Sequence, residues 1–433
     1  MTDRPLALGG GSADPEGMGD DRAGVTLRSR AREALASRPG ARTLVPALLA
    51  AVAYVDPGNF GVNIASGAEH GYTLVWVVVF ASCSAMLIQY LAAKVGIATG
   101  RSLAELSAER YPGAGRIALW LQAEVVVIMT DLAEIVGGAL GLQLLFGWPL
   151  IAGALVVTAF SLVVLALKVR GRSHFEAVVL VLLLVIIGAL LWQVFVADVD
   201  RAALLRSVLP GPLDSSAALL AVGIVGATVM PHALHFHSAA SRVANDGTAA
   251  GAGGQRARAG RRAVRSIVIA MTVAAAANIS LVVFAAGLPA AAGESLEAAY
   301  VALQTQAGEV AATMLGVALL ASGLAATLVG VQTGDVVMQG FGRRPIPAVV
   351  RRLLAVVPCL IVLGIEVNPT QALVWSQVVL SFALPGTLIP LLVLTRDRRL
   401  MGVLTNRPVT TAVAALVTAV IVGLCAFLVV TGL

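Results

Sequence analysis

Residues 43–71 read TLVPALLAAVAYVDPGNFGVNIASGAEHG, an apolar run interrupted at its middle by Asp56, Pro57, Gly58 and Asn59. The run exceeds the roughly 20 residues that an α-helix needs to cross a bilayer. Proline removes a backbone donor and clashes with the preceding turn, and glycine is costly inside a helix. We therefore expect a membrane helix that breaks at mid-depth. Unwound backbone is tolerated there only where it is buried in protein or lines a cavity, so the break itself predicts a site.

The rest of the chain has the same apolar character. Of its 433 residues, 58% are hydrophobic and 12% are charged, which excludes an ordinary soluble domain. Eleven apolar spans predict an all-α integral membrane protein with 11 transmembrane helices. The expected spans are 43–71, 72–97, 115–145, 149–168, 175–198, 216–240, 265–288, 309–340, 349–365, 370–395 and 408–431. Residues 1–42 lack an apolar core, so we expect a disordered cytoplasmic N-terminal tail, followed by a transmembrane domain over residues 43–433.

Positive charge predicts the orientation of these spans. Nearly every Lys and Arg of the connections falls on the N-terminal side, including five arginines between residues 256 and 265, whereas the other side carries only Arg201 and Arg206. Such a bias predicts a cytoplasmic N-terminus, and an odd number of spans then leaves the C-terminus outside. In a membrane protein the net charge of +6 therefore indicates orientation and not nucleic-acid binding. The three cysteines lie inside apolar spans and are expected to be small buried hydrophobic residues.

A second interrupted span lies five spans after the first. Residues 216–240 read SAALLAVGIVGATVMPHALHFHSAA, with Gly223, Gly226, Met230 and Pro231 near the middle. Paired interrupted segments at matching positions in two halves are typical of inverted-repeat transporters. Spans one to five and six to ten are thus expected to form the two repeats, with the site between them and span eleven at the periphery.

The two breaks also carry a family resemblance. Asp56-Pro57-Gly58-Asn59, followed by Met230-Pro231-His232 and then His237-Ser238, resembles the signature of the Nramp family, the natural resistance-associated macrophage proteins. Supporting stretches are Asp131-Leu132-Ala133-Glu134, Ala321-Ser322-Gly323 and Ser376-Gln377-Val378. The resemblance covers residues 43 to 431 and implies a leucine-transporter-like fold. It also implies proton-coupled import of Mn²⁺ or Fe²⁺, as transported substrate and not as cofactor, across a bacterial-type plasma membrane.

The expected metal ligands surround the two breaks. A lone carboxylate such as Asp56 at mid-membrane is a functional hypothesis by default, because it requires a cation, a proton or a partner. Oxygen ligands alone would suit Mg²⁺ or Ca²⁺, whereas the soft thioether of Met230 favours Mn²⁺, Fe²⁺ or later transition metals. The resemblance adds a side-chain oxygen from Gln377. The full expected set is Asp56, Asn59, Met230 and Gln377, with the backbone carbonyls of Ala53 and Ala227.

A proton route is expected beside the metal site. Glu124, Asp131 and Glu134 are separated by seven and three residues, which places them on one helix face. Arg351 and Arg352 start span nine on the same side of the membrane and predict an ionic network with these carboxylates. The resemblance associates proton movement with Asp56, Asp131, Glu134 and His232. A static salt-bridge network that only orients the helices is the alternative.

The histidine-rich segment that starts at His232 differs in part from the family pattern. Ala233 and His235 stand where the family more often has an asparagine or aliphatic residue and a tyrosine. A metal site built on His232 and His235 is disfavoured, because paired imidazoles would bind zinc or copper too tightly for turnover.

Other functions remain as alternatives. A related Mg²⁺ carrier would use the same scaffold without the soft Met230. A sodium-coupled amino acid carrier would place the substrate carboxylate at the first break, where Asp56 would repel it. A channel or receptor fits two helix breaks that face one site less well than alternating access does. No phosphate-binding loop, GxSxG or HExxH motif occurs, so enzymatic activity is not expected, and no cofactor or obligatory protein partner is inferred.

Overall fold

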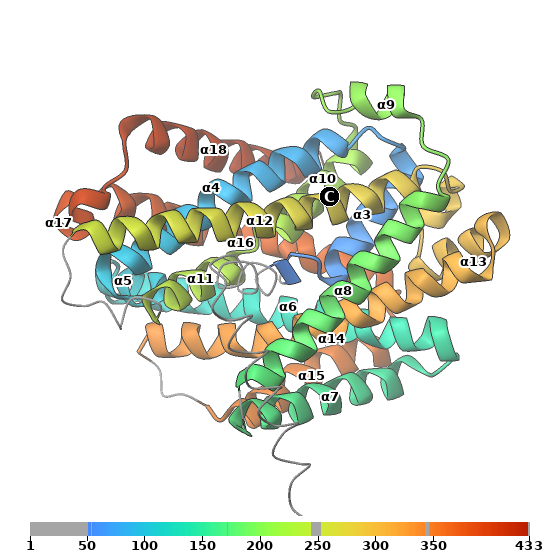
Figure 1. Ribbon diagram of the computed structural model, residues 1–433, viewed down its shortest axis with the longest axis horizontal. Helices are drawn as coiled ribbons and strands as arrows, with labels where there is room; N and C mark the ends of the chain where they lie inside the picture. The colour runs from blue at the N-terminus through green and yellow to red at the C-terminus, as the bar shows by residue number, and fades with distance from the viewer. Residues whose placement is uncertain (1–50, 53, 171, 244–252, 343–345, 432–433) are drawn as a thin grey trace, which may run out of the picture. The chain divides into compact units, whose positions relative to one another are not determined.

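The computed structural model describes residues 51–52, 54–170, 172–243, 253–342 and 346–431. All helices described belong to one compact unit, residues 46–433. Within the described residues the chain forms helices joined by turns and loops, without a strand, in agreement with the all-α prediction (Figure 1). The predicted N-terminal tail, residues 1–42, lies outside the described residues.

The helices follow the predicted apolar spans closely, and residues 43–50 and 53 of the first predicted span lie outside the described residues. Their bounds are α3 (Pro57–His70), α4 (Val75–Thr99), α5 (Leu103–Arg110), α6 (Ala114–Phe146), α7 (Leu150–Arg170), α8 (Arg172–Val196), α9 (Arg201–Arg206), α10 (Ser215–Val229), α11 (Pro231–Val243), α12 (Gly253–Ala285), α13 (Leu296–Ala307), α14 (Glu309–Gly340), α15 (Ala348–Gly364), α16 (Pro369–Arg396), α17 (Arg398–Met401) and α18 (Pro408–Val430), with 3-10 turns η1 (Ala290–Gly293) and η2 (Gly402–Leu404).

Eight helical stretches in the described part are long and apolar enough to cross a membrane. They are α4, α6, residues 177–196 of α8, α10 together with α11, residues 260–285 of α12, α14, α16 and α18. The other three predicted spans correspond to α3, α7 and α15. Of these, α3 has 14 residues, α15 has 17, and the apolar part of α7 is Leu150–Ala166. The number of 11 spans therefore stays a prediction.

Small residues allow the central helices to approach closely. A Cβ atom on Gly323 of α14 would lie 2.6 Å from the Cα of Gly138 on α6, so only glycines fit at this crossing. Such close crossings are how membrane helices gain van der Waals contact without a hydrophobic driving force between them. Further helix pairs in contact are α14 with α8, α16 with α6 and α10, and α12 with α3 and α4, the last seen side by side in Figure 1.

Burial separates the central helices from the peripheral ones. In α10 with α11, 94% of the most apolar 18-residue stretch is buried, against 33% in α8 and in α18. The apolar side chains exposed on α8 and α18, such as Phe195 and Val409, are suited to contact with lipid. Cys359 and Cys425 are buried as predicted. The prediction for Cys83 was wrong, because it lies on the outward side of α4 and is exposed.

Candidate functional site

The first break lies immediately before α3. Tyr54, Val55 and Asp56 are not helical, and α3 begins at Pro57, where a missing N–H costs nothing. Asp56 is the N-cap of α3, and its Oδ1 accepts a hydrogen bond of 2.9 Å from the backbone N–H of Asn59. The break is therefore shorter than predicted, because Gly58 and Asn59 belong to the first turn of α3. Ala53, an expected ligand, lies outside the described residues.

Asn59 connects the two breaks. Its Nδ2 donates to Asp56 Oδ1 at 2.7 Å, to the carbonyl of Tyr54 at 3.3 Å and to the carbonyl of Ala227 on α10 at 3.2 Å. The last contact joins residues 168 positions apart in the sequence. With the amide nitrogen directed to these acceptors, Asn59 Oδ1 is buried and has no partner, and the same holds for Asp56 Oδ2. Two oxygen atoms are thus left for a further ligand.

The second break is centred on Met230. Gly223 and Gly226, which were expected to contribute to it, are still helical in α10, and α11 begins at Pro231. Met230 has φ 36 and ψ 95, and its N–H donates to the carbonyl of Gly226 at 3.3 Å. A positive φ is unusual for a non-glycine residue, and such conformations cluster at functional sites. Met230 is also fully buried.

Gln377 of α16 lies against both interrupted helices. A Cβ atom on Gly58 would be 1.9 Å from Gln377 Nε2, and a Cβ on Gly226 would be 2.0 Å from the Gln377 carbonyl oxygen. The two glycines therefore let α3 and α10 approach α16. Gln377 Nε2 donates to Ser376 Oγ at 3.0 Å, and Gln377 Oε1 is buried without a partner.

The region around the two breaks contains one carboxylate, Asp56, among neutral side chains that carry oxygen atoms. Buried oxygens without a partner are Asp56 Oδ2, Asn59 Oδ1, Thr228 Oγ1 and Gln377 Oε1. A buried polar atom left without a hydrogen bond is costly, and a bound cation would satisfy several of these atoms together. In the part of the chain that the structure describes, no group of three or more His, Cys, Asp or Glu side chains is arranged to hold a metal ion. A metal ion at this site would depend on Asp56 and neutral ligands.

The predicted acidic face of α6 meets α15. Arg352 Nη1 donates to Asp131 Oδ1 at 2.9 Å, and Arg352 Nε donates to Ser161 Oγ at the same distance. Arg351 pairs with Glu124 at 3.4 Å and lies 3.8 Å from Asp335 on α14, which the sequence analysis missed. The structure thus brings together four of the five groups expected in the ionic network.

Glu134 is the exception in this network. It is 2% exposed, and its Oε2 has no hydrogen-bond partner. The carboxylate lies against Gly330 of α14, where a Cβ atom would be 2.7 Å from Oε2. One turn further along α6, a Cβ on Gly137 would be 2.0 Å from Cβ of Pro57. Glu134 therefore lies close to the first turn of α3, and an unpaired carboxylate oxygen can accept a proton.

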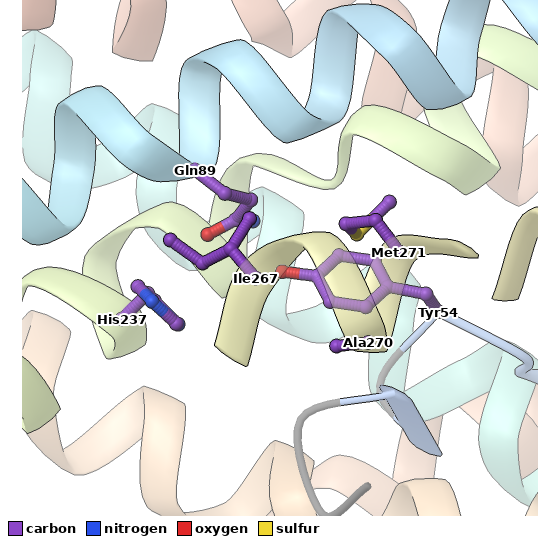
Figure 2. Close-up of a pocket in the computed structure, with 6 residues that line it drawn as sticks. All are labelled: Tyr54, Gln89, His237, Ile267, Ala270 and Met271. Atoms are coloured by element: carbon purple, nitrogen blue, oxygen red, sulfur yellow. The ribbon is translucent and has the colours of Figure 1, made fainter. Parts of the chain in front are cut away.

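The three histidines of α11 have different surroundings. His232 Nδ1 is 3.2 Å from the hydroxyl of Thr130, the residue before Asp131. His235 packs edge-on against Phe341. His237 lines a narrow pocket with Tyr54, Gln89, Ile267, Ala270 and Met271. Figure 2 shows the hydroxyl end of Tyr54 and the amide of Gln89 directed into this space.

Polar residues outside the predicted set hold the first break in place. Ser322 Oγ of α14 donates to the carbonyl of Val55 at 2.6 Å, and Asn278 Nδ2 of α12 donates to the carbonyl of Tyr54 at 3.4 Å. Asn278 also accepts from Asn63 of α3 at 3.2 Å. A polar side chain inside an apolar span is the signal that could have identified them, since such residues need a partner within the protein.

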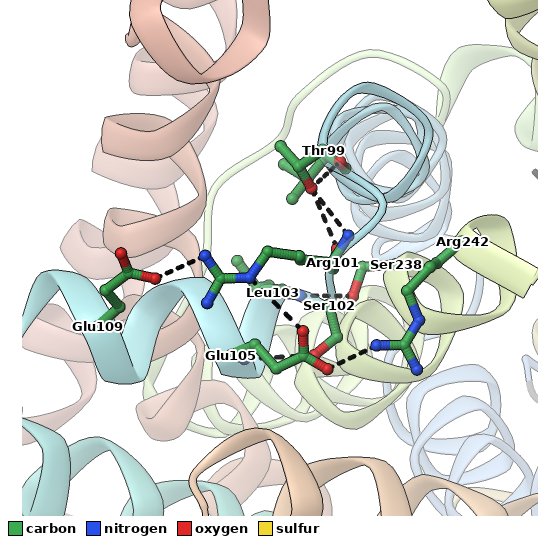
Figure 3. A network of polar contacts seen from close by, with 9 residues as sticks. Thr99, Arg101, Ser102, Leu103, Glu105, Glu109, Ser238 and Arg242 are labelled. Carbon is green, nitrogen blue, oxygen red and sulfur yellow. Dashed lines mark hydrogen bonds and ion pairs between the residues drawn. The ribbon is translucent and has the colours of Figure 1, made fainter. Parts of the chain in front are cut away.

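A polar network connects α5 with the end of α11 (Figure 3). Arg242 Nη1 donates to Glu105 Oε1 at 2.6 Å, and Ser238 Oγ accepts from the backbone N–H of Leu103 at 2.9 Å. Arg101 pairs with Glu109 at 2.6 Å. The helix that follows the Met230 break is therefore tied at its far end to the connection between α4 and α6.

The chain is similar in sequence and in fold to known transporters. The chain is 42% identical over 393 residues to the divalent metal cation transporter MntH of Yersinia pestis (strain Pestoides F), covering 89% of this chain and 94% of that protein. Identity to MntH of Bacillus subtilis (strain 168) is also 42%, covering 89% and 91%. The manganese transporter of Eremococcus coleocola, in complex with an aromatic bis-isothiourea substituted compound, superposes with a TM-score of 0.77 at 29% identity, covering 88% and 84%.

A more distant likeness concerns the fold alone. Mhp1, a nucleobase-cation-symport-1 family transporter, superposes with a TM-score of 0.59 at 18% identity, covering 89% of this chain and 91% of Mhp1. The family model described as natural resistance-associated macrophage protein-like matches residues 47–431, which include both helix breaks. Because that match spans nearly the whole sequence, the chain belongs to the Nramp family.

Proposed function

We propose that this chain is a secondary active transporter that imports Mn²⁺ or Fe²⁺ together with protons by alternating access. The observation that carries the proposal is the pairing of Asp56 and Asn59, each with one buried oxygen that has no partner, at a helix break beside Met230. A dication would neutralise the carboxylate and complete the coordination of the neutral oxygens. The names of the relatives, divalent metal cation and manganese transporters, support the same substrate class.

The proposed metal site combines hard and soft ligands. Asp56, Asn59 and Gln377 would supply side-chain oxygens, and the Ala53 and Ala227 carbonyls are proposed as further ligands. Because the Ala227 carbonyl accepts from Asn59 at 3.2 Å, metal binding there would use its second lone pair or a rearranged Asn59. The Met230 thioether would favour transition metals over Mg²⁺ and Ca²⁺.

The proposed proton route leads from the metal site to α6. Asp56, Glu134 and His232 would exchange the proton near the site, and Asp131 and Glu124 would carry it further. Arg351 and Arg352 would hold these two carboxylates in the ionic network, because a guanidinium does not give up its own proton. Support comes from the unpaired Oε2 of Glu134 beside Gly330 and from the contact of His232 with Thr130. A metal ion that binds Asp56 would displace the proton of this carboxyl group toward Glu134, because the metal ion and the proton compete for the same carboxylate.

The proposed arrangement in the membrane follows from the charge bias. The chain would cross the plasma membrane 11 times, with the N-terminus in the cytoplasm, the C-terminus outside, and spans one to five and six to ten as inverted repeats. The bilayer, divalent metal ions and protons are the proposed partners. No cofactor, catalytic activity or obligatory protein partner is part of the proposal.

Transport into proteoliposomes tests the function directly. When the solution outside the vesicles is more acidic than the lumen, we expect uptake of Mn²⁺ and Fe²⁺ but little uptake of Mg²⁺ or Ca²⁺. Asp56→Asn should abolish uptake, because it removes the charge while keeping the shape. Asp214→Asn is the matched control: this exposed carboxylate caps α10, and asparagine caps a helix equally well. Full uptake by a folded Asp56→Asn protein would refute the site.

Met230→Ala separates the proposed carrier from its alternatives. Loss of the thioether should keep Mn²⁺ uptake but weaken discrimination against Ca²⁺ by roughly tenfold or more, since about 1.4 kcal/mol corresponds to tenfold in affinity. Preferred Mg²⁺ uptake by the unmodified protein would favour the Mg²⁺ carrier. Sodium-dependent uptake of an amino acid would favour the carrier of that class.

A further inference from the structure

The N-terminal part of α12 extends beyond the length that the hydrocarbon layer requires. The helix has 33 residues, from Gly253 to Ala285. At 1.5 Å per residue it is about 50 Å long, whereas the hydrocarbon layer is about 30 Å thick and is crossed by about 20 residues. The last 20 residues of α12 start at Ser266, directly after Arg261, Arg262 and Arg265. If those 20 residues cross the hydrocarbon layer, these three arginines, which we call the α12 arginine face, lie where lipid headgroups begin.

The α12 arginine face is directed away from the protein. The buried stripe of α12 consists of Ile267, Ala270, Met271 and Ala274, which share the side that packs on α3 and α4. At 100° per residue, the mean direction of the three arginines is about 180° from this stripe. All three are exposed, as are Val268, Thr272 and Ala276 further along the same side. The arginines thus continue the stripe of α12 that faces lipid.

No carboxylate of the described residues neutralises the charge of this surface. Helix α12 contains no Asp or Glu, and within the described residues none of Arg261, Arg262 and Arg265 has a carboxylate partner. By contrast, Arg242 pairs with Glu105, and Arg352 pairs with Asp131. The α12 arginine face therefore has its hydrogen-bond donors available.

We infer that the α12 arginine face binds the headgroups of anionic phospholipids. Guanidinium groups bind phosphate oxygens in a bidentate manner, and clusters of basic residues next to a membrane helix attract acidic lipids. The occupant must contact the exposed apolar stripe around Val268 as well as the charged groups above it. A phospholipid does both at once, whereas a soluble anion or an acidic peptide would reach only the arginines. This inference is independent of which ion the protein transports.

Lipid selectivity in reconstituted protein tests the inference. Phosphatidylglycerol and phosphatidylcholine with the same spin-labelled chain are compared for association with the full-length protein. We expect a preference for phosphatidylglycerol on the order of 10-fold, which declines as salt is raised. The triple variant R261Q/R262Q/R265Q should lose most of this preference, and R261K/R262K/R265K should keep most of it because charge is retained.

Two controls make the outcome specific. R201Q/R206Q removes two exposed arginines from the short helix α9 and should leave the preference unchanged. Each variant is first shown to unfold at the same temperature as the parent. Equal preference in the parent and in R261Q/R262Q/R265Q would overturn the inference, as would an equal loss in R201Q/R206Q. Displacement of the labelled lipid by soluble glycerol phosphate at equal concentration would show a phosphate site that needs no bilayer, and would overturn it as well.

Discussion

The crossing of α10 and α16 at Gly226 allows a quantitative prediction for Gly226→Ala. The new Cβ would lie 2.0 Å from the backbone oxygen of Gln377 and 2.8 Å from Ser381 Oγ, whereas ordinary contacts begin at 3.4 Å. The two backbones would have to separate by about 1.4 Å, since a backbone oxygen cannot rotate away as a side chain can. The 2.5 Å hydrogen bond from Ser381 Oγ to the Val222 carbonyl would then open to about 3.9 Å, beyond bonding range.

The expected magnitude combines three effects. The new Cβ overpacks a backbone atom, which we expect to destabilise the protein by about 3 kcal/mol, the upper end of the range usual for overpacking. Loss of the hydrogen bond adds about 1 kcal/mol, and the better helix propensity of alanine returns about 1 kcal/mol. The net destabilisation of the closed crossing is about 3 kcal/mol. If this destabilisation affects only the conformation that binds the metal, the affinity for Mn²⁺ drops on the order of 100-fold.

Calorimetric Mn²⁺ binding and thermal unfolding of the purified protein measure this effect. Gly188→Ala on α8 is the control, because a Cβ there meets nothing within 4 Å. Gly58→Ala provides a second comparison: its Cβ would meet the flexible amide of Gln377, so adding Gln377→Ala should restore stability there, but not in Gly226→Ala. Unchanged Mn²⁺ affinity and stability in Gly226→Ala would refute the proposed close crossing.

Three further predictions concern single contacts. Ser322→Ala removes the donor to the Val55 carbonyl and should lower the free energy of unfolding by about 1–3 kcal/mol; no change would mean that another donor replaces it. Glu134→Gln should flatten the pH dependence of uptake while Mn²⁺ affinity changes little, and an unaltered pH profile would leave Glu134 a structural residue. Arg242→Gln breaks a partly exposed pair with Glu105, worth less than about 1 kcal/mol, so the unfolding temperature should barely move while hydrogen exchange in α5 accelerates. Slow exchange in that variant would show that other contacts hold α5.

Local chemistry explains which features were predictable from the sequence. Long apolar runs have few stable states in a bilayer other than helices, so the positions of α4, α6, α14, α16 and α18 follow from composition alone. Proline fits the first turn of a helix but disrupts a helix interior, so Pro57 and Pro231 predict where α3 and α11 begin, within a few residues. A carboxylate in such a run requires a partner, which identified Asp56 as a candidate without any coordinates.

The tertiary structure alone decided how the breaks meet. The contact of Asn59 with the Ala227 carbonyl, 168 residues away, and that of Ser322 with Val55, 267 residues away, depend on how whole helices cross. The positive φ of Met230 and the Oε2 atom of Glu134 left without a hydrogen-bond partner are likewise invisible in the sequence. The periodicity of apolar residues in the sequence shows which residues share a face of one helix, but it does not show how two helices pack against each other. That packing arises from many small van der Waals contacts at glycine crossings, and it determines which buried oxygens have a hydrogen-bond partner and which have none.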